Sequence, residues 1–340
     1  MPEGTEAVGP PLGHGPLTAL FAAGLDAGRL ASAYLLAGPP GVGKRHFARW
    51  AVRLTQCAAR KGTEPCGTCN PCRASLSGND PCFVEVAFRE EKGEHESMVE
   101  AARRFAAEAL RAAAPGRRCF YLLPNIQDYS LALQNSLLKT LEEPPAGVTF
   151  FLTADRPEQV LETIVSRCQE FQFLPLAHAD LIRVLEARGF PSRQAGELAL
   201  LSAGRVDLAL KFATEPYRRL LAWFRELDAQ PAPDFLVAAD EATVLAEDLE
   251  GEEGAAGQDR PKLAELAALH LRHFFASSLE LAREHYLAFH ILNLASEELL
   301  GAREALAGSG HPMLCLEQYF RVAFERRAQI LRFSHTALNV

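Results

Sequence analysis

The sequence predicts an α/β domain with a parallel sheet, followed by regions that are helical throughout. Three observations support this prediction. A glycine-rich loop of phosphate-binding type follows an apolar strand near the N-terminus, further apolar strands alternate with helical segments up to about residue 173, and strand patterns then disappear. Strands that alternate with helices after such a loop are typical of a doubly wound α/β fold.

The elements of this domain follow from hydrophobic periodicity and from helix breakers. Strands are expected at 34–37, 83–86, 118–123 and 148–153. Helices are expected at 17–30, 44–57, 98–114, 130–142 and 157–166. The helix at 130–142 should end before Pro144-Pro145, because proline lacks the N–H group that a helix needs.

The chain divides into three predicted domains, 1–173, 174–215 and 216–340, and the last two are helical. Helices in the second are expected at 178–188, 192–202 and 205–214. In the third, long helical stretches are expected at 217–227, 263–285 and 315–331. Residues 228–258 contain two prolines and an acidic, glycine-containing run, so we expect a loop there.

Composition limits the possible functions. The 340 residues are 48% hydrophobic and 23% charged, as in an ordinary globular protein, and the net charge is −8. This charge argues against a stand-alone nucleic-acid binder, which needs concentrated Lys and Arg. The chain has no apolar run of membrane-spanning length, and its N-terminus has no basic start followed by an apolar core. We therefore expect a cytoplasmic protein.

Four of the eight cysteines form a cluster with the spacing of a metal site. They are Cys57, Cys66, Cys69 and Cys72. Zinc prefers four soft ligands in a tetrahedron, and turn-forming residues such as Pro65, Gly67 and Pro71 separate these cysteines. A coincidence or a redox pair is the weaker alternative. The zinc would be structural, since four cysteine ligands leave no open position for water.

The phosphate-type loop contains Gly38, Gly41, Gly43 and Lys44, which suffice for an anion cradle at a helix start. Arg45 stands where Mg²⁺ binding needs Ser or Thr. The strand at 118–123 is followed by Pro124-Asn125, so it lacks the carboxylates that an NTPase uses to hold Mg²⁺ and orient water. These two defects favour a phosphate-type loop that no longer supports nucleotide hydrolysis. Whether nucleotide still binds, with Arg45 in place of Mg²⁺, is left open.

Several segments resemble subunits of the bacterial DNA polymerase III clamp loader, an AAA+ assembly. They are GRLASAYLLAGPPGVGK at 28–44, the cysteine spacing, QNSLLKTLEEPP at 134–145, and VTFFLTADRPEQVLETIVSRCQEFQF at 148–173. The resemblance implies an AAA+-like domain at 1–173 with a zinc module at 57–72. It also implies a helical lid domain at 174–215 and a collar domain at 216–340 that oligomerises.

The departures from the family pattern favour a delta-prime type of subunit over the ATP-hydrolysing gamma/tau type. The acidic pair of the active subunits falls on Pro124 and Asn125, and their Mg²⁺-binding Thr falls on Arg45. Their sensor after the fourth strand falls on Thr153-Ala154-Asp155, and the sensor arginine of the lid falls on Asp207, with Arg205 close by. Arg167 in Ser166-Arg167-Cys168 is retained, and by resemblance it is an arginine finger for the ATP site of a neighbouring subunit.

The resemblance therefore implies a stator without its own ATPase activity inside a DNA polymerase III holoenzyme. Its expected partners are gamma/tau and delta subunits in a hetero-oligomer, with sliding clamp and primer-template DNA reached through the complex. Zinc is the expected cofactor, and hydrolysis of ATP by this chain is not expected. The alternatives are an ATP-hydrolysing gamma/tau-type subunit and an unrelated zinc-stabilised nucleic-acid-binding module.

Overall fold

The computed structural model describes residues 9–86, 118–230, 233–246, 260–282, 286–307 and 312–336. It forms two compact units. The first comprises Met1–Ala195 with Ala203–Asp207, and the second comprises Gly196–Ser202 with Leu208–Val340. Among the described residues, no helix is both long and apolar enough to cross a membrane. The division into three domains stays a prediction.

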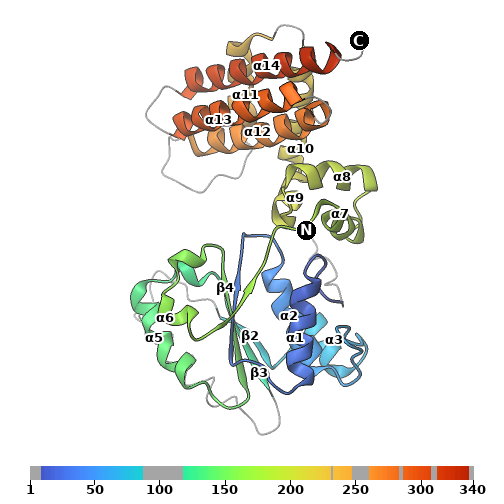
Figure 1. The fold of residues 1–340 in the computed structure, drawn as a ribbon, viewed down its shortest axis with the longest axis vertical. Helices are drawn as coiled ribbons and strands as arrows, with labels where there is room; N and C mark the ends of the chain where they lie inside the picture. The colour runs from blue at the N-terminus through green and yellow to red at the C-terminus, as the bar shows by residue number, and fades with distance from the viewer. Residues whose placement is uncertain are drawn as a thin grey trace. The chain divides into compact units, whose positions relative to one another are not determined.

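The first unit contains a five-stranded parallel sheet (Figure 1). Its strands are β1 (Ala33–Ala37), β2 (Phe83–Glu85), β3 (Cys119–Leu123), β4 (Val148–Ala154) and β5 (Gln169–Gln172). The strand order is β2-β3-β4-β1-β5, and all pairs are parallel. The fifth strand was not expected from the sequence. It is a short edge strand on which only Phe171 is buried, so its sequence QEFQ lacks the apolar run of the inner strands.

Helices cover both faces of this sheet (Figure 1). One face carries α1 (Gly15–Asp26) and α2 (Lys44–Gln56), and the other carries α5 (Leu131–Glu142) and α6 (Glu162–Val165). Alternate residues of β1 enter the two cores: Tyr34 and Leu36 pack with α1 and α2, and Leu35 packs with α5 and α6. The inner strands are buried on both sides, which explains their continuous apolar sequences.

Short elements complete the first unit. They are α3 (Asn70–Leu76), η1 (Ile126–Asp128), η2 (Pro157–Gln159) and α7 (His178–Ala187). The Ser130 hydroxyl caps α5 by accepting from the Leu133 N–H at 3.3 Å, and α5 ends before Pro144-Pro145 as expected. The helix predicted at 98–114 lies outside the described residues.

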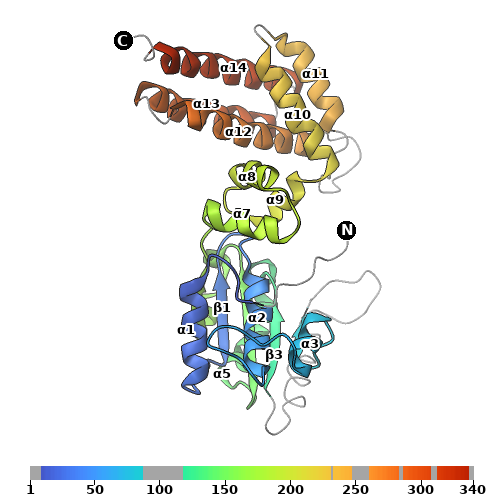
Figure 2. The same cartoon turned by 90° about the vertical axis from the view of Figure 1, so that its right-hand side faces the viewer.

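In the described residues after α7, the regular secondary structure is helical. It contains α8 (Ser192–Leu201), α9 (Val206–Phe212), α10 (Glu215–Ala229), α11 (Phe235–Ala246), α12 (Arg260–Ala282), α13 (Tyr286–Ala307) and α14 (Pro312–Thr336). Helices α11 to α14 pack side by side (Figure 2). The parallel sheet with flanking helices and the helical remainder confirm the predicted fold class.

One expectation for this part of the chain was wrong. The segment 228–258 was predicted to be a loop, but α11 occupies Phe235–Ala246 within it. Ala238, Ala242 and Ala246 recur at a spacing of four residues and are buried, so small side chains form the buried face of this helix. The acidic run at 247–257 lies outside the described residues.

A buried histidine in the second unit makes stability depend on pH. His270 is buried between α10 and α14, and its Nδ1 lies 3.2 Å from the Tyr319 hydroxyl, which donates to the Ala267 carbonyl at 2.9 Å. Burial lowers the pKa of His270 to about 3, whereas the unfolded chain takes up this proton near pH 6.5. Acid therefore favours the unfolded state between these two pH values.

We expect His270→Phe to weaken the pH dependence of unfolding. For wild type, His270 should cost up to about 1.4 kcal/mol of stability per pH unit as pH falls from 6.5 towards 3. Denaturant unfolding of both proteins at several pH values measures the difference in slope. Equal slopes over this range would contradict the assignment.

Candidate functional site

The phosphate-type loop lies at the carboxyl ends of the parallel strands. It leaves β1 at Gly38, whose N–H donates to the Ala154 carbonyl of β4 at 3.0 Å, and it enters α2 at Lys44. Gly38, Gly41 and Gly43 all have positive φ values, of 144°, 72° and 103°. The loop therefore has the strand, loop and helix context that the sequence predicted.

Gly38 is required by packing as well as by conformation. A Cβ atom at this position would lie 2.2 Å from the Phe173 carbonyl oxygen, which is backbone and has little room to move. At Gly43 the nearest atom to such a Cβ, in His14, is 3.9 Å away, so only the backbone conformation opposes a side chain.

We expect Gly38→Ala to destabilise the protein by about 3 kcal/mol or more, because steric overlap adds to backbone strain. Gly43→Ala, the matched control, should cost about 1–2 kcal/mol from strain alone. Denaturant unfolding in the absence of nucleotide measures the loss of stability in both variants. Equal losses would show that the contact with Phe173 is relaxed at no cost.

Lys44 is turned into the protein and is only 6% exposed. Its Nζ donates to the carbonyl oxygens of Gly38 at 2.5 Å and Pro39 at 2.6 Å, and to Asp155 Oδ1 at 2.6 Å. An ammonium group has three N–H donors, so these acceptors satisfy all of them. Burial lowers the pKa of Lys44, and the carboxylate of Asp155 opposes this shift.

A second carboxylate lies against the loop. A Cβ atom at Gly41 would lie 1.6 Å from Asp207 Oδ1, so the Asp207 carboxylate fills the space beside that glycine. The Val206 N–H donates to the Gly41 carbonyl at 2.9 Å, and Arg205 Nη2 contacts Asp207 Oδ2 at 2.7 Å. The segment Ala203–Asp207 therefore packs on the loop within the first unit.

The metal-binding positions of an NTPase hold other groups here. Arg45 Nη1 lies 3.0 Å from Glu85 at the end of β2, so Arg45 forms an ion pair beside the loop. β3 ends before Pro124 and Asn125, and the Asn125 N–H donates to Thr153 Oγ1 at 2.9 Å. β4 lies between β1 and β3, so β3, which precedes Pro124, is not an immediate neighbour of β1, which leads into the loop.

Arg167 lies in the turn between α6 and β5 and is 32% exposed. Its Nη1 donates to the Thr163 carbonyl at 2.7 Å, and its Nη2 forms an ion pair with Glu142 at the end of α5. The adjacent Cys168 packs against the core under α5 and α6, and burial raises its pKa to about 12. The turn thus anchors Cys168 inward and presents Arg167 outward.

Arg167 and the phosphate-type loop lie at opposite ends of two neighbouring strands. Arg167 precedes the start of β5, whereas the loop follows the carboxyl end of β1, and the two strands are parallel neighbours with Tyr34 beside Gln169. Gly38 is four residues beyond Tyr34, a rise of about 13 Å along the strand. An arginine side chain does not span this length, so Arg167 cannot contact phosphate in the loop of its own chain.

The four clustered cysteines come together in space. Their Sγ atoms all lie within 4.8 Å of one another, in an arrangement that could hold a metal ion. Cys57 follows α2, Cys69 precedes α3, and Cys72 lies in the first turn of α3. Hydrogen bonds from Cys69 and Thr68 lower the pKa of Cys66 to about 6, which favours a thiolate. Four thiol donors at this spacing fit a tetrahedral zinc ion.

Two contacts attach the cysteine module to α2. Trp50 Nε1 donates to the Thr63 carbonyl at 3.0 Å, and Arg53 Nε lies 3.3 Å from the Ser75 hydroxyl. Trp50 and Arg53 are fully buried, so the module is part of the packed first unit.

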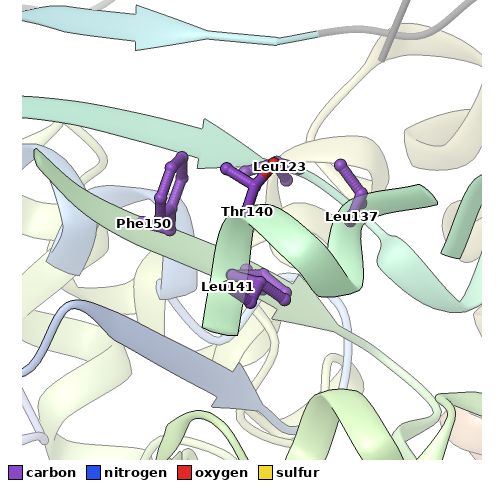
Figure 3. Close-up of a pocket in the computed structure, with 6 residues that line it drawn as sticks. Leu123, Leu137, Thr140, Leu141 and Phe150 are labelled. Carbon is purple, nitrogen blue, oxygen red and sulfur yellow. The ribbon is translucent and has the colours of Figure 1, made fainter. Parts of the chain in front are cut away.

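A cavity beneath α5 is too small for a substrate. Leu137, Thr140 and Leu141 of α5 face Leu123 of β3 and Phe150 of β4 around it (Figure 3), and its volume is about 10 Å³. A void of this size at an apolar lining barely admits one water molecule. It is a packing gap between helix and sheet.

Comparison with known families finds a match within the first unit. Residues 13–177 match the family model described as "DNA polymerase III, delta subunit". This part of the chain is similar to the DNA polymerase III family that the model describes. The match agrees with the resemblance seen in the sequence, and it covers the strands, the cysteine cluster, the phosphate-type loop and Arg167.

Curated relatives carry both kinds of clamp-loader name. DNA polymerase III subunit tau of Salmonella typhimurium is 38% identical over 160 residues, which cover 47% of this chain and 24% of that protein. DNA polymerase III subunit delta' of Pseudomonas aeruginosa is 34% identical over 178 residues, which cover 51% of this chain and 53% of that protein. The matches thus span a quarter to about half of the relatives' lengths.

A solved structure of a DNA polymerase III gamma subunit-related protein from Thermotoga maritima aligns with 90% of this chain and 99% of its own. Its TM-score is 0.48 and its sequence identity is 14%.

The sequence singled out the loop, the cysteines and Arg167 as candidates, but it did not indicate which residues contact the loop and Arg167 in the structure. Asp155 and Asp207 were noted only as altered sensor positions, and the structure brings both to the loop. Glu142 lies in the quoted string LEEPP and contacts Arg167. The only sequence signal for the two aspartates was a charged residue where the family pattern has another type.

Proposed function

We propose that this chain is a non-hydrolysing, delta-prime-type subunit of a DNA polymerase III clamp loader. In this proposal it acts as a stator and donates Arg167 to the ATP site of a neighbouring subunit while the sliding clamp is loaded. The partners would be gamma/tau and delta subunits, and the clamp and primer-template DNA would be reached through the complex. Such a subunit would work in the cytoplasm.

The position of Arg167 carries this proposal. The side chain lies near the amino end of β5, whereas its own phosphate-type loop follows the carboxyl end of β1. The turn that carries it leaves the side chain 32% exposed. After its ion pair with Glu142 is released, a guanidinium in this place would reach phosphate bound by another subunit and would stabilise charge in the transition state of phosphoryl transfer.

The contents of the loop support the absence of ATPase activity. Lys44 donates all its hydrogens to Gly38, Pro39 and Asp155, and Arg45 is paired with Glu85. No carboxylate stands at Pro124 or Asn125 to hold Mg²⁺ or to orient water. Each of these features removes a separate requirement of hydrolysis.

We further propose that the cysteine cluster binds one structural zinc ion. Cys57, Cys66, Cys69 and Cys72 would supply all four ligands, which leaves no position for substrate. The metal would hold the start of α3 against the end of α2.

Assays of the isolated chain and of the reconstituted complex test the proposal. With Mg²⁺ and ATP, the isolated chain should show no hydrolysis above the rate without protein, while the complex should need the chain for full clamp-stimulated hydrolysis. Hydrolysis by the isolated chain that Lys44→Ala abolishes would instead support the ATP-hydrolysing gamma/tau type.

A further inference from the structure

We propose that Asp155 and Asp207 are resident anions that occupy the phosphate positions of the loop, so that a polyphosphate can bind only after both charges are removed. The inference rests on the proposed function in taking the chain as a non-hydrolysing subunit. It adds that the anion cradle itself is intact and is filled from within.

The first part of the argument is the environment of Lys44. A phosphate-loop lysine normally donates to ligand phosphate oxygens. Here one donor goes to Asp155 Oδ1 at 2.6 Å, and the carboxylate reaches Lys44 from the end of β4, 111 residues along the chain. A carboxylate oxygen and a phosphate oxygen are equivalent partners for an ammonium group, so Asp155 satisfies the site that a ligand would use.

The second part is the position of Asp207. Its Oδ1 lies 1.6 Å from the point that a Cβ on Gly41 would occupy, so the carboxylate lies on the surface of the loop. Close backbone approach at a glycine is what admits phosphate to such loops. The charge of Asp207 also acts on Lys44 in the same direction as that of Asp155. A nucleotide phosphate here would overlap the Asp207 carboxylate, whose charge Arg205 partly offsets.

The third part is the conformation of the loop. Gly38, Gly41 and Gly43 keep the positive φ values that a phosphate cradle needs, and α2 still begins at Lys44. The backbone has therefore not collapsed into another shape. Two internal carboxylates replace the ligand, and the hydrogen bond from Val206 to Gly41 attaches the segment Ala203–Asp207 to the loop.

Removing both carboxylates should open the site. We would measure binding of ATP, with and without Mg²⁺, to the full chain and to the double variant Asp155→Ala, Asp207→Ala by equilibrium dialysis. The double variant should bind ATP at least tenfold more tightly than wild type, and adding Lys44→Ala should abolish the gain. Circular dichroism checks that each variant is folded.

The matched control is Asp26→Ala, Glu215→Ala, which changes the net charge equally. Both carboxylates are exposed: Asp26 at the end of α1 is paired with Arg60, and Glu215 at the start of α10, in the second unit, is paired with Arg218. This variant should bind ATP no better than wild type. An equal gain in the control would assign the effect to overall charge and overturn the proposal, as would a folded double variant without any gain.

Wild type gives an independent measurement. Lys44 should be acylated more slowly than the exposed lysines, and millimolar ATP should leave its rate unchanged, as followed by mass spectrometry. Protection of Lys44 by ATP in wild type would overturn the inference, because the cradle would then be accessible. That result would leave the proposed role of Arg167 untouched, since that role concerns the ATP site of another subunit.

Discussion

Arg167→Ala is expected to leave the clamp-loader complex assembled but to slow the ATP site that Arg167 serves by about 10³-fold or more. The physical reason is that a guanidinium offsets the charge that develops on the transferred phosphoryl group. The hydrolysis rate of the whole complex should fall towards the rate of its other sites. Steady-state ATPase with clamp and primed DNA measures this, and size-exclusion chromatography checks assembly.

Two further variants sharpen this test. Arg183→Ala removes an exposed arginine of α7 that is paired with Asp180, and it should leave the rate of the complex unchanged. Arg167→Lys keeps the charge but loses the planar, two-pronged geometry, so it should recover only part of the activity. An unchanged ATPase rate for Arg167→Ala, in an assembled complex with clamp and DNA, would refute the proposed role.

Zinc removal is expected to have the second largest effect. The purified chain should contain about one zinc ion, and Cys72→Ser should abolish it and destabilise the first unit by more than about 3 kcal/mol. Cys72 is buried in α3, so loss of the proposed metal would leave four thiols crowded together and only side-chain and backbone contacts to hold the module on α2. Elemental analysis and thermal unfolding measure the two quantities.

Cys315→Ser is the control for this experiment. Cys315 lies in α14, outside the cluster, and its replacement should change neither the zinc content nor the unfolding of the first unit. A chain without zinc that unfolds at the same temperature as the zinc-loaded chain would contradict a structural role for the metal. Full zinc retention by Cys72→Ser would contradict the proposed ligand set.

Features set by neighbouring residues could be predicted from the sequence. The inner strands β1, β3 and β4 are buried on both faces, so their sequences are continuous apolar runs that mark them as strands. The cysteine cluster was recognisable because its four ligands lie within sixteen residues of chain and are separated by turn formers.

Two elements could not be predicted from the sequence, for different reasons. β5 has only Phe171 on the core side, since it pairs with β1 on one edge alone, and four mostly polar residues do not show a strand pattern. α11 buries alanines, whose small side chains give a weak periodic signal between two prolines and an acidic run.

Some properties of the loop follow from the sequence, and others only from the tertiary structure. The sequence by itself determined the cradle, Arg45 and the absence of carboxylates at Pro124 and Asn125, because these are identities at known spacings. Only the tertiary structure decided which carboxylates lie against the loop and at which end of the strands Arg167 lies. Asp155 contacts Lys44, which is 111 residues away in the sequence. The parallel pairing of β1 and β5 puts Arg167 at the amino ends of these strands and the loop at their carboxyl ends. Contacts between residues so far apart depend on how strands pair and helices pack, and no local pattern of residues encodes them.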